Sequence, residues 1–157
     1  CAIFNALKWA GLCDNSIEII RNLYKDCTTR VRCAEGLTEK IAVEAGVRQG
    51  CPLSPIIFNL TMEPLLKAIS ASEEGYHIRQ QKTNVLAYAD DIVLIANAEN
   101  GMKELIQTTE AVAKWSGLLF NGGKCATLHI KNKNVHPTQF IMGNANMKTL
   151  GREEHTD

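Results

Sequence analysis

The stretch Val85-Leu-Ala-Tyr-Ala-Asp-Asp-Ile-Val-Leu-Ile95 places two adjacent acids, Asp90 and Asp91, between two short apolar runs. Residues 85–87 and 92–95 are typical of buried β-strands, and Asn84 and Asn97 bound the unit. Asp is a poor strand former, and an unpaired buried carboxylate costs on the order of several kcal/mol. The pattern therefore predicts a strand–turn–strand unit whose acids are compensated by a cation, and a divalent metal is the simplest candidate.

Length and composition are those of an ordinary globular domain. The chain has 157 residues, 45% of them hydrophobic and 22% charged, which is enough for one core. No apolar run approaches the roughly 18 residues of a membrane helix, and no signal peptide is visible, so we expect an intracellular protein without a membrane partner. The chain begins at Cys1 and ends at Asp157 without start or stop features, so we expect a fragment of a longer polypeptide.

The charges balance, but they are not evenly spread. The 17 basic and 17 acidic residues cancel, which argues mildly against a free-standing nucleic-acid binder. Basic residues nevertheless cluster in two places, and these are Lys25, Arg30, Arg32, Lys40 and Arg48, and then Lys124, Lys131 and Lys133. Either a locally positive groove or a solvated mixed surface fits this distribution.

Six cysteines occur without a C-x-x-C pair. A chain of this length does not need disulfides, so reduced thiols are expected. Cys125, His129 and His136 have a spacing that zinc could use, but residues 125–130 alternate like a strand. Structural packing is the favoured interpretation of these residues.

The remaining pattern predicts a mixed arrangement of helices and strands. Helices are expected over residues 2–11, from a cap at Asp14 or Asn15, from an N-cap at Ser54 with Pro64 bending or restarting it, and from Asn100 to Gly117. Extended segments are expected at residues 28–34, 39–47, 76–80, 84–88, 92–96, 118–120, 125–130, 138–142 and 147–150, the first two around a turn at Glu35-Gly36. Because the elements do not alternate regularly, the fold class is predicted to be α+β.

Paired carboxylates suit magnesium, which prefers oxygen ligands. Two such ions about 3.5–4 Å apart can clamp the attacking and leaving oxygens of a phosphoryl displacement. Neighbouring residues of an extended strand point to opposite faces, so Asp90 is predicted to face the metals more squarely than Asp91. A further ligand would then come from another strand, and the alternative is a solvated hairpin tip.

The segment Gly46-Val-Arg-Gln-Gly-Cys-Pro-Leu-Ser-Pro55 has the chemistry of a nucleotide site. Gly50 would allow a ligand to approach the backbone closely. Gln49 offers amide donors and an acceptor, and Arg48 offers a charge that matches phosphate. The alternative is a polar loop followed by a helix cap.

Three motifs together resemble the reverse transcriptases of non-long-terminal-repeat retrotransposons. They are the segment 46–55 followed by Phe58-Asn59, the stretch 86–95, and Trp115-Ser-Gly-Leu-Leu-Phe-Asn-Gly-Gly-Lys-Cys125. Their order and spacing match the family over residues 2–130, and the closing stretch is most similar to elements that insert into ribosomal RNA genes.

The resemblance implies a role for each matching residue. Asp90 would be a metal ligand, Asp91 would support the metals, and Tyr88 would lie under the primer end. Gln49 and Gly50 would lie against the incoming nucleotide and template base. Lys124 would lie near the leaving pyrophosphate as a proton donor or charge stabiliser, or else be a surface lysine after a turn.

The implied fold is an incomplete right-hand palm, an antiparallel sheet packed on helices. Residues 1–45 would connect fingers and palm, 46–130 would form the palm, and 131–157 would lead toward the thumb. The implied reaction is two-metal nucleotidyl transfer with magnesium, an RNA template, a DNA primer at its target and deoxynucleoside triphosphates. The family acts in the nucleus, and its polyprotein is expected to carry an endonuclease.

One departure from the family limits the expectation. A further metal-binding Asp belongs to an earlier strand of the family, and no matching motif occurs in residues 1–157. The isolated chain is therefore expected to lack polymerase activity. Two alternatives remain open: a reverse transcriptase of the group II intron kind, and a decayed palm domain that only binds RNA.

Overall fold

The computed structural model describes residues 2–43, 46–48 and 50–150. The chain divides into two compact units, Cys1–Pro64 and Leu65–Asp157, and each is described by itself. In the part of the chain that the structure describes, no helix combines the length and the apolarity needed to span a bilayer.

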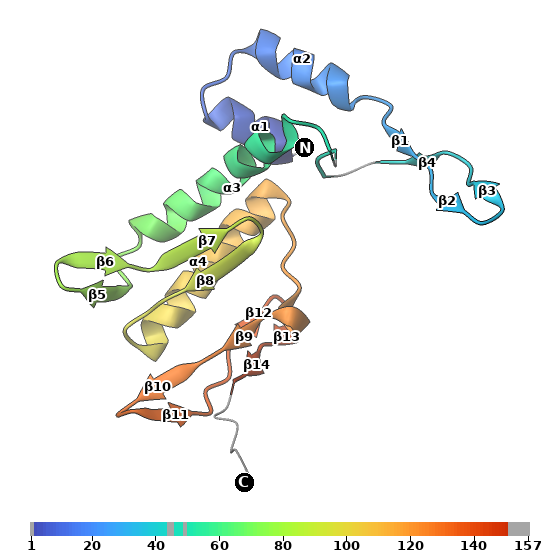
Figure 1. Cartoon of the computed structure of the whole chain (residues 1–157). Coiled ribbons are helices and arrows are strands. Elements are labelled where there is room, and N and C mark those ends of the chain that lie inside the picture. The colour runs from blue at the N-terminus through green and yellow to red at the C-terminus, as the bar shows by residue number, and fades with distance from the viewer. Residues whose placement is uncertain (1, 44–45, 49, 151–157) are drawn as a thin grey trace. The chain divides into compact units, whose positions relative to one another are not determined.

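The first unit consists of helices followed by very short strands (Figure 1). Its elements are α1 (Ala2–Trp9), α2 (Asp14–Tyr24), β1 (Thr28–Thr29), β2 (Arg32–Cys33), β3 (Gly36–Leu37), β4 (Ile41–Ala42) and the first part of α3 (Ser54–Ala71). Strand β1 pairs with β4 and β2 with β3, both antiparallel. The expected hairpin is confirmed, but its turn lies at Ala34-Glu35, one residue earlier than predicted.

Apolar residues at helical spacing form the core of this unit. Leu7, Ile17, Ile20 and Ile57 are at most 8% exposed, and Phe4, Tyr24 and Leu53 pack against them. The apolar face of each helix is thereby removed from water, which is the main stabilising contribution to such a unit.

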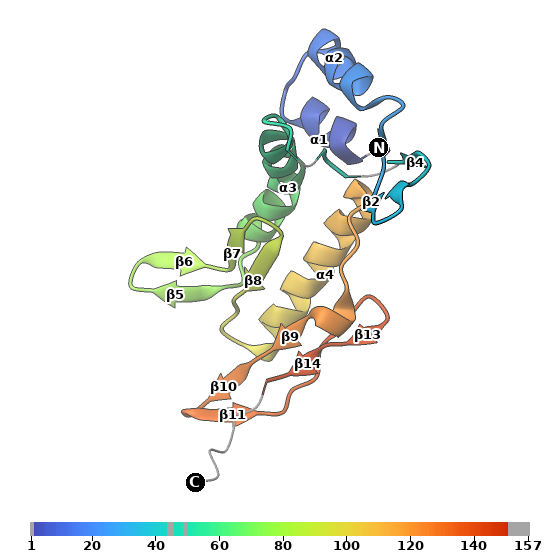
Figure 2. The ribbon, with the colours of Figure 1, turned by 45° about the vertical axis from the view of Figure 1, so that its right-hand side comes forward.

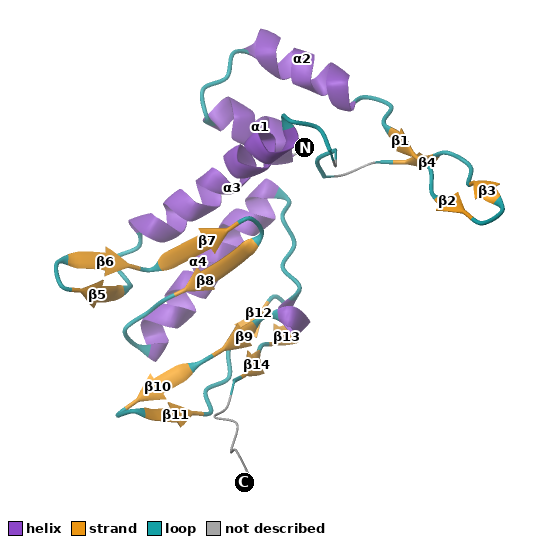
Figure 3. Cartoon of the chain, in the orientation of Figure 1, coloured by secondary structure: helices purple, strands orange, loops and turns teal. Residues whose placement is uncertain are grey.

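The second unit contains the remaining strands and the long helix α4 (Glu99–Ser116). Its strands are β5 (Tyr76–Ile78), β6 (Gln81–Thr83), β7 (Val85–Tyr88), β8 (Asp91–Leu94), β9 (Ala126–Thr127), β10 (His129–Lys131), β11 (Asn134–His136), β12 (Ile141–Met142), β13 (Ala145–Asn146) and β14 (Lys148–Thr149), with the 3₁₀ helix η1 (Gly122–Lys124) before β9. Figure 3 shows how short most of these strands are. They pair as β5–β6, β7–β8, β10–β11 and β12–β13 antiparallel, and β9–β14 parallel.

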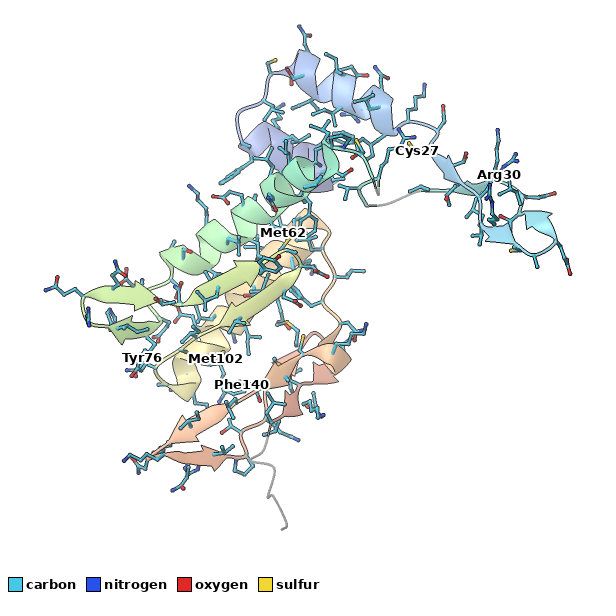
Figure 4. All side chains as sticks on the ribbon, viewed as in Figure 1. Cys27, Arg30, Met62, Tyr76, Met102 and Phe140 are labelled. Atoms are coloured by element: carbon cyan, nitrogen blue, oxygen red, sulfur yellow. The ribbon has the colours of Figure 1, made fainter. Side chains whose placement is uncertain are left out.

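A second core cluster joins α4 to the segments after it. Ile106, Phe140 and Met142 are at most 6% exposed, and Leu94 and Met102 pack against them. Figure 4 shows Met102 and Phe140 facing this cluster from α4 and from the chain before β12. Because Leu94 belongs to the cluster, one face of the β7–β8 pair is held against α4, as Figure 2 shows.

The predicted α+β class is confirmed, with helices and mainly antiparallel strands. Several boundaries were wrong. Helix α4 begins at Glu99 with Ala98 in the N-cap position, so Asn100 lies inside it. Cys13, not Asp14 or Asn15, occupies the N-cap position of α2, and it makes no side-chain capping hydrogen bond. Strand β6 was missed because Gln81–Thr83 is polar, and residues 118–120 form no strand.

Of two predictions about the helices, the one for Gly117 is confirmed, and a helix restart at Pro64 is not observed. Gly117 ends α4 as expected: it lies in the left-handed region at φ 73°, and its N–H donates to the Ala113 carbonyl. Pro64 does not restart a helix, since α3 runs without interruption from Ser54 to Ala71.

Candidate functional site

The predicted strand–turn–strand unit is the β7–β8 hairpin. Its register pairs Val85 with Leu94 and Tyr88 with Asp91, which leaves Ala89 and Asp90 as a two-residue turn. Ala89 has a φ of 51°, and a positive φ at the first central residue alone is the type II′ pattern, in which glycine is usual. A non-glycine residue there costs on the order of 1 kcal/mol, and such strain is concentrated at functional sites.

The hairpin has one packed face and one open face. Residues directly opposite each other share a face, so Leu86, Tyr88, Asp91 and Val93 lie together on the side opposite to Leu94. Leu86 is 55% exposed, Val93 54% and Tyr88 84%. The open face therefore presents an aromatic ring and a carboxylate side by side at the hairpin tip.

The flanking strands were expected to be buried, and this was wrong for one of their faces. Asp90 and Asp91 are both exposed, and only one face of the flanking strands is partly buried. The physical reason is that a two-stranded sheet leaves its second face and its edges uncovered. Burial therefore does not force a compensating cation on the acids, and what they offer is an accessible pair of oxygen ligands.

Asn84 anchors the base of this hairpin, and the sequence interpretation treated it only as a boundary. Its side chain is 5% exposed, and its Nδ2 donates to the carbonyls of Ile69 at 2.7 Å, Glu74 at 3.1 Å and Ser72 at 3.4 Å. Its own carbonyl accepts the N–H of Ile95 at 2.9 Å. Asn84 thus ties the hairpin to the end of α3, and the only sequence signal was a lone Asn before an apolar run.

Lys124 closes the short helix η1 and is exposed. The close packing of η1 depends on Gly122, where an added Cβ would lie 2.7 Å from the Met142 carbonyl oxygen and 2.8 Å from the Ala145 Cβ. Gly122 therefore fixes the backbone from which Lys124 extends, a role that the sequence interpretation did not assign. Among the described residues, Lys124 forms no ion pair.

The segment before α3 belongs to the first unit. Ser54 is buried, its Oγ donates to the Arg48 carbonyl at 2.6 Å, and Tyr24 Oη lies 3.1 Å from that Oγ. Because the single Ser54 hydroxyl proton is used on Arg48, Tyr24 is the donor of the second bond. The predicted N-cap role is thus replaced: Ser54 is the first residue of α3, and its side chain closes the loop.

Arg48 and Gly50 have clear local reasons for their conformations. The Arg48 Nη1 donates to the Leu23 carbonyl at 3.3 Å, which ties the loop to the end of α2. Gly50 has a φ of 80° with open space around its Cα, so its backbone conformation already requires glycine. Gln49 lies outside the described residues, and the roles assigned to these three residues stay predictions.

The Cys51 thiol in this loop has a lowered pKa. The Leu53 backbone N–H, helped by Ser54 and by the Arg48 charge, holds the pKa of the Cys51 thiol below its ordinary value, although some burial acts in the opposite direction. The end of the loop, just before α3, therefore favours negative charge on this thiol, as expected near a helix N-terminus.

The chemistry of the donors fits a hard divalent cation in part. Asp90 and Asp91 supply exposed carboxylate oxygens, the ligand type that magnesium prefers. Within the described ranges, no group of three or more His, Cys, Asp or Glu side chains could hold a metal. The zinc interpretation is weakened further because the Cys125 thiol donates to the Asn121 carbonyl at 3.4 Å.

The structure brings together some of the predicted residues. Tyr88, Asp90 and Asp91 share one hairpin tip, and Lys124 lies in the same unit. Arg48 and Gly50 belong to the other unit.

Comparison with known proteins identifies the family. The family model described as "Reverse transcriptase (RNA-dependent DNA polymerase)" matches residues 4–153. The chain is 31% identical, over 98% of its length, to the Pol polyprotein of the type-2 retrotransposable element R2DM of Drosophila melanogaster. It is 30% identical over 81% of its length to a polyprotein of the type-1 element R2 of Popillia japonica, and 29% identical over 98% to that of Nasonia vitripennis.

These relatives are much longer proteins. The chain spans 15% of the Drosophila polyprotein, 21% of the Popillia protein and 16% of the Nasonia protein. The resemblance to retrotransposon enzymes is nevertheless confirmed, and the chain belongs to the reverse transcriptase family, whose polymerase domain implies a palm-type fold.

Proposed function

We propose that this chain contains most of the palm of an RNA-directed DNA polymerase within a retrotransposon polyprotein, and that the full-length protein copies the element RNA into DNA at a nicked target. The observation that carries the proposal is the β7–β8 tip, where Asp90 and Asp91 are exposed beside Tyr88 on a strained two-residue turn. Family membership supplies the reaction class.

Asp90 and Asp91 would hold magnesium, together with a further Asp outside this chain. Bound magnesium would activate the primer 3′-hydroxyl and neutralise the charge that develops on the α-phosphate and pyrophosphate. The chain's own residues bind and orient the reactants. Tyr88, 84% exposed on the same face as Asp91, offers its ring to the primer end.

The nucleotide is assigned to the loop before α3 and to Lys124. Arg48 contributes positive charge, while Gln49 and Gly50 contact the incoming nucleotide and the template base. Lys124, exposed and without an ion pair in the described part of the chain, is available to stabilise or protonate the leaving pyrophosphate.

The wider assignment follows from the relatives. Residues 1–45 would connect fingers and palm, 46–130 would form the palm, and 131–157 would lead to the thumb. The relatives are Pol polyproteins of retrotransposable elements, so a companion endonuclease and action in the nucleus are proposed for the full-length protein. The 157-residue chain alone is proposed to be inactive, because the acid that completes the site is not among its residues.

The proposal is tested by polymerisation on an RNA template. A longer polyprotein that includes this chain is assayed for deoxynucleotide incorporation with Asp90→Asn and Asp91→Asn variants. We expect incorporation to fall at least about a hundredfold for Asp90→Asn, because removal of a charge-stabilising group at a reacting centre has that magnitude. Glu73→Gln, which removes an exposed acid from the same unit, should retain activity.

Retained incorporation in Asp90→Asn would contradict the assignment. An unaltered polyprotein that binds RNA but never incorporates nucleotides would favour the decayed RNA-binding alternative. Primer extension by the purified 157-residue chain would overturn the proposal that it is inactive alone.

A further inference from the structure

The strongest unassigned feature is a segregation of charge in the second unit. The chain as a whole is neutral, yet residues 111–150 contain no Asp or Glu and carry five lysines, namely Lys114, Lys124, Lys131, Lys133 and Lys148. The next acids along the chain, Glu153, Glu154 and Asp157, lie outside the described residues. We call residues 117–150, which comprise η1 and β9–β14, the basic module.

The lysines of the basic module are available to a partner. Lys124, Lys131, Lys133 and Lys148 are all exposed. Among the residues that the structure describes, none of their ammonium groups forms an ion pair or a side-chain hydrogen bond. By contrast, Lys103 on α4 is paired with Glu99 at 2.7 Å, so lysines elsewhere in this unit do find acids.

The β10–β11 hairpin concentrates donors on one face. Its register pairs His129 with His136 and Lys131 with Asn134, so these four side chains share a face. The two imidazole rings have centroids 5.6 Å apart, and His129 Nδ1 is held by the Thr138 hydroxyl. The four side chains themselves are ammonium, amide and imidazole groups, and Glu99, an acid that interacts with His129 on this face, is already paired with Lys103. Figure 1 shows the hairpin extending beyond β9 and β14.

The turn of this hairpin keeps a lysine at a conformational cost. Asn132 and Lys133 have φ values of 52° and 64°, and two consecutive positive φ values are the type I′ pattern, whose second position strongly prefers glycine. Lysine in the left-handed region costs on the order of 1 kcal/mol. A long cationic side chain thus occupies a turn position where glycine would fold better, next to a second exposed lysine, Lys131.

We propose that the basic module, with the β10–β11 hairpin as its tip, binds the sugar–phosphate backbone of a nucleic acid. The charge pattern by itself indicates a polyanionic partner. The inference rests on the proposed function only for the choice of nucleic acid over an acidic protein as that partner. Lysine and asparagine side chains that contact phosphates position a protein without reading sequence. Each phosphate contact releases condensed counterions, so binding depends on salt with a slope set by the number of contacts.

The test measures the affinity of the 157-residue chain for labelled nucleic acid by fluorescence anisotropy from about 50 to 200 mM salt. Three probes are compared: single-stranded RNA, single-stranded DNA and an RNA–DNA hybrid. The double variant Lys131→Gln/Lys133→Gln should bind all three more weakly, and its slope of log K against log salt should fall by about 2. The matched control Lys8→Gln/Lys103→Gln removes the same charge from α1 and α4 and should leave that slope unchanged.

A second variant separates binding from folding. Lys133→Gly removes the strain of a positive φ at a non-glycine residue, so this variant should unfold at a higher temperature than the unaltered chain. Its affinity for nucleic acid should nevertheless fall, and its slope of log K against log salt should drop by about 1. A purely structural role for Lys133 predicts no loss of affinity.

Three outcomes would overturn the inference. The unaltered chain could fail to bind at about 50 mM salt, the control could lose as much slope as the test variant, or polyglutamate could compete as well as RNA at equal charge. Failure of the polymerase assignment would be seen separately, as deoxynucleotide incorporation retained by Asp90→Asn in the longer polyprotein, and it would leave the salt slopes of the lysine variants unchanged.

Discussion

Two hairpins of the second unit share a construction and differ in charge. Both β7–β8 and β10–β11 are antiparallel pairs closed by two residues, and both place non-glycine residues at positive φ, Ala89 in one and Asn132 with Lys133 in the other. The first presents Asp90 and Asp91 at its tip, and the second presents lysines. The same construction thus carries opposite charge at its two tips, and the proposed roles, cation binding at the acidic tip and phosphate binding at the basic one, follow that difference.

The hairpins also differ in how firmly they are held. Strand β8 packs Leu94 against the Ile106 cluster, and Asn84 ties the base of the acidic hairpin to three carbonyls. In β10–β11, Ile130 is 62% exposed. The acidic tip is therefore expected to be positioned more rigidly. Its proposed catalytic role would require this, whereas the proposed contacts of the basic tip to a nucleic-acid backbone would tolerate more freedom.

The largest effect is expected from loss of the Asn84 anchor. Asn84→Ala leaves buried carbonyls unpaired and should lower the free energy of unfolding by about 1–3 kcal/mol. Asn84→Asp should cost more, because it turns a carboxylate toward three carbonyl oxygens. Urea unfolding of the 157-residue chain measures both changes. The matched control is Asn97→Ala, which replaces the exposed asparagine just after the β7–β8 hairpin. This control should change the free energy of unfolding by less than about 0.5 kcal/mol.

The basic module has its own packing requirement at Gly122. Gly122→Ala forces a methyl group against the Met142 carbonyl and should destabilise the chain by about 1–3 kcal/mol. Gly123→Ala, whose added Cβ would lie no nearer than 3.5 Å to Asn121 Oδ1, should be close to neutral. Equal losses for the two variants in thermal unfolding would show that η1 is not packed as described.

A smaller effect of definite sign is expected at the acidic turn. Ala89→Gly relieves the positive φ and should raise the free energy of unfolding by up to about 1 kcal/mol. Ala87→Gly, in the adjoining strand, should lower it by about 0.5–1 kcal/mol, because glycine weakens an extended strand. The comparison by urea unfolding fails if both variants change stability in the same direction.

The smallest effect concerns the helix beneath the acidic hairpin. A hydrogen bond from Lys103, with its positive charge, holds the pKa of the exposed Glu99 carboxyl below its ordinary value. A carboxyl whose folded pKa is depressed contributes stability that is present above its unfolded pKa and is lost as pH falls through the folded value. The unaltered chain should therefore lose a little stability as the pH falls below about 4.5, and Glu99→Gln should lose less. The measurement is the change in unfolding midpoint between about pH 6 and about pH 3 for each protein.

The sequence was most informative where the determinants are local. The Tyr88–Asp91 turn and the end of α4 at Gly117 follow from turn chemistry and helix capping, and the structure has both. The sequence left open whether Asp90 lies in a metal site or at a solvated hairpin tip. The roles of Asn84 and Gly122 could not be predicted, because they depend on what lies across the fold from each residue. Strand β6 was missed for a related reason, since its polar residues pair through their backbone and carry no hydrophobic pattern.

The most direct test of the acidic hairpin as a cation site is paramagnetic broadening by Mn²⁺ in amide NMR spectra of the 157-residue chain. We predict that substoichiometric Mn²⁺ broadens the amides of residues 88–92 first and that Asp90→Asn/Asp91→Asn abolishes this broadening. The adjacent acids Glu73 and Glu74 provide an internal control of equal formal charge in the same unit. Broadening at Glu73 and Glu74 that equals or exceeds that at Asp90 and Asp91 would contradict the assignment of the β7–β8 tip as the metal-binding part of a polymerase site.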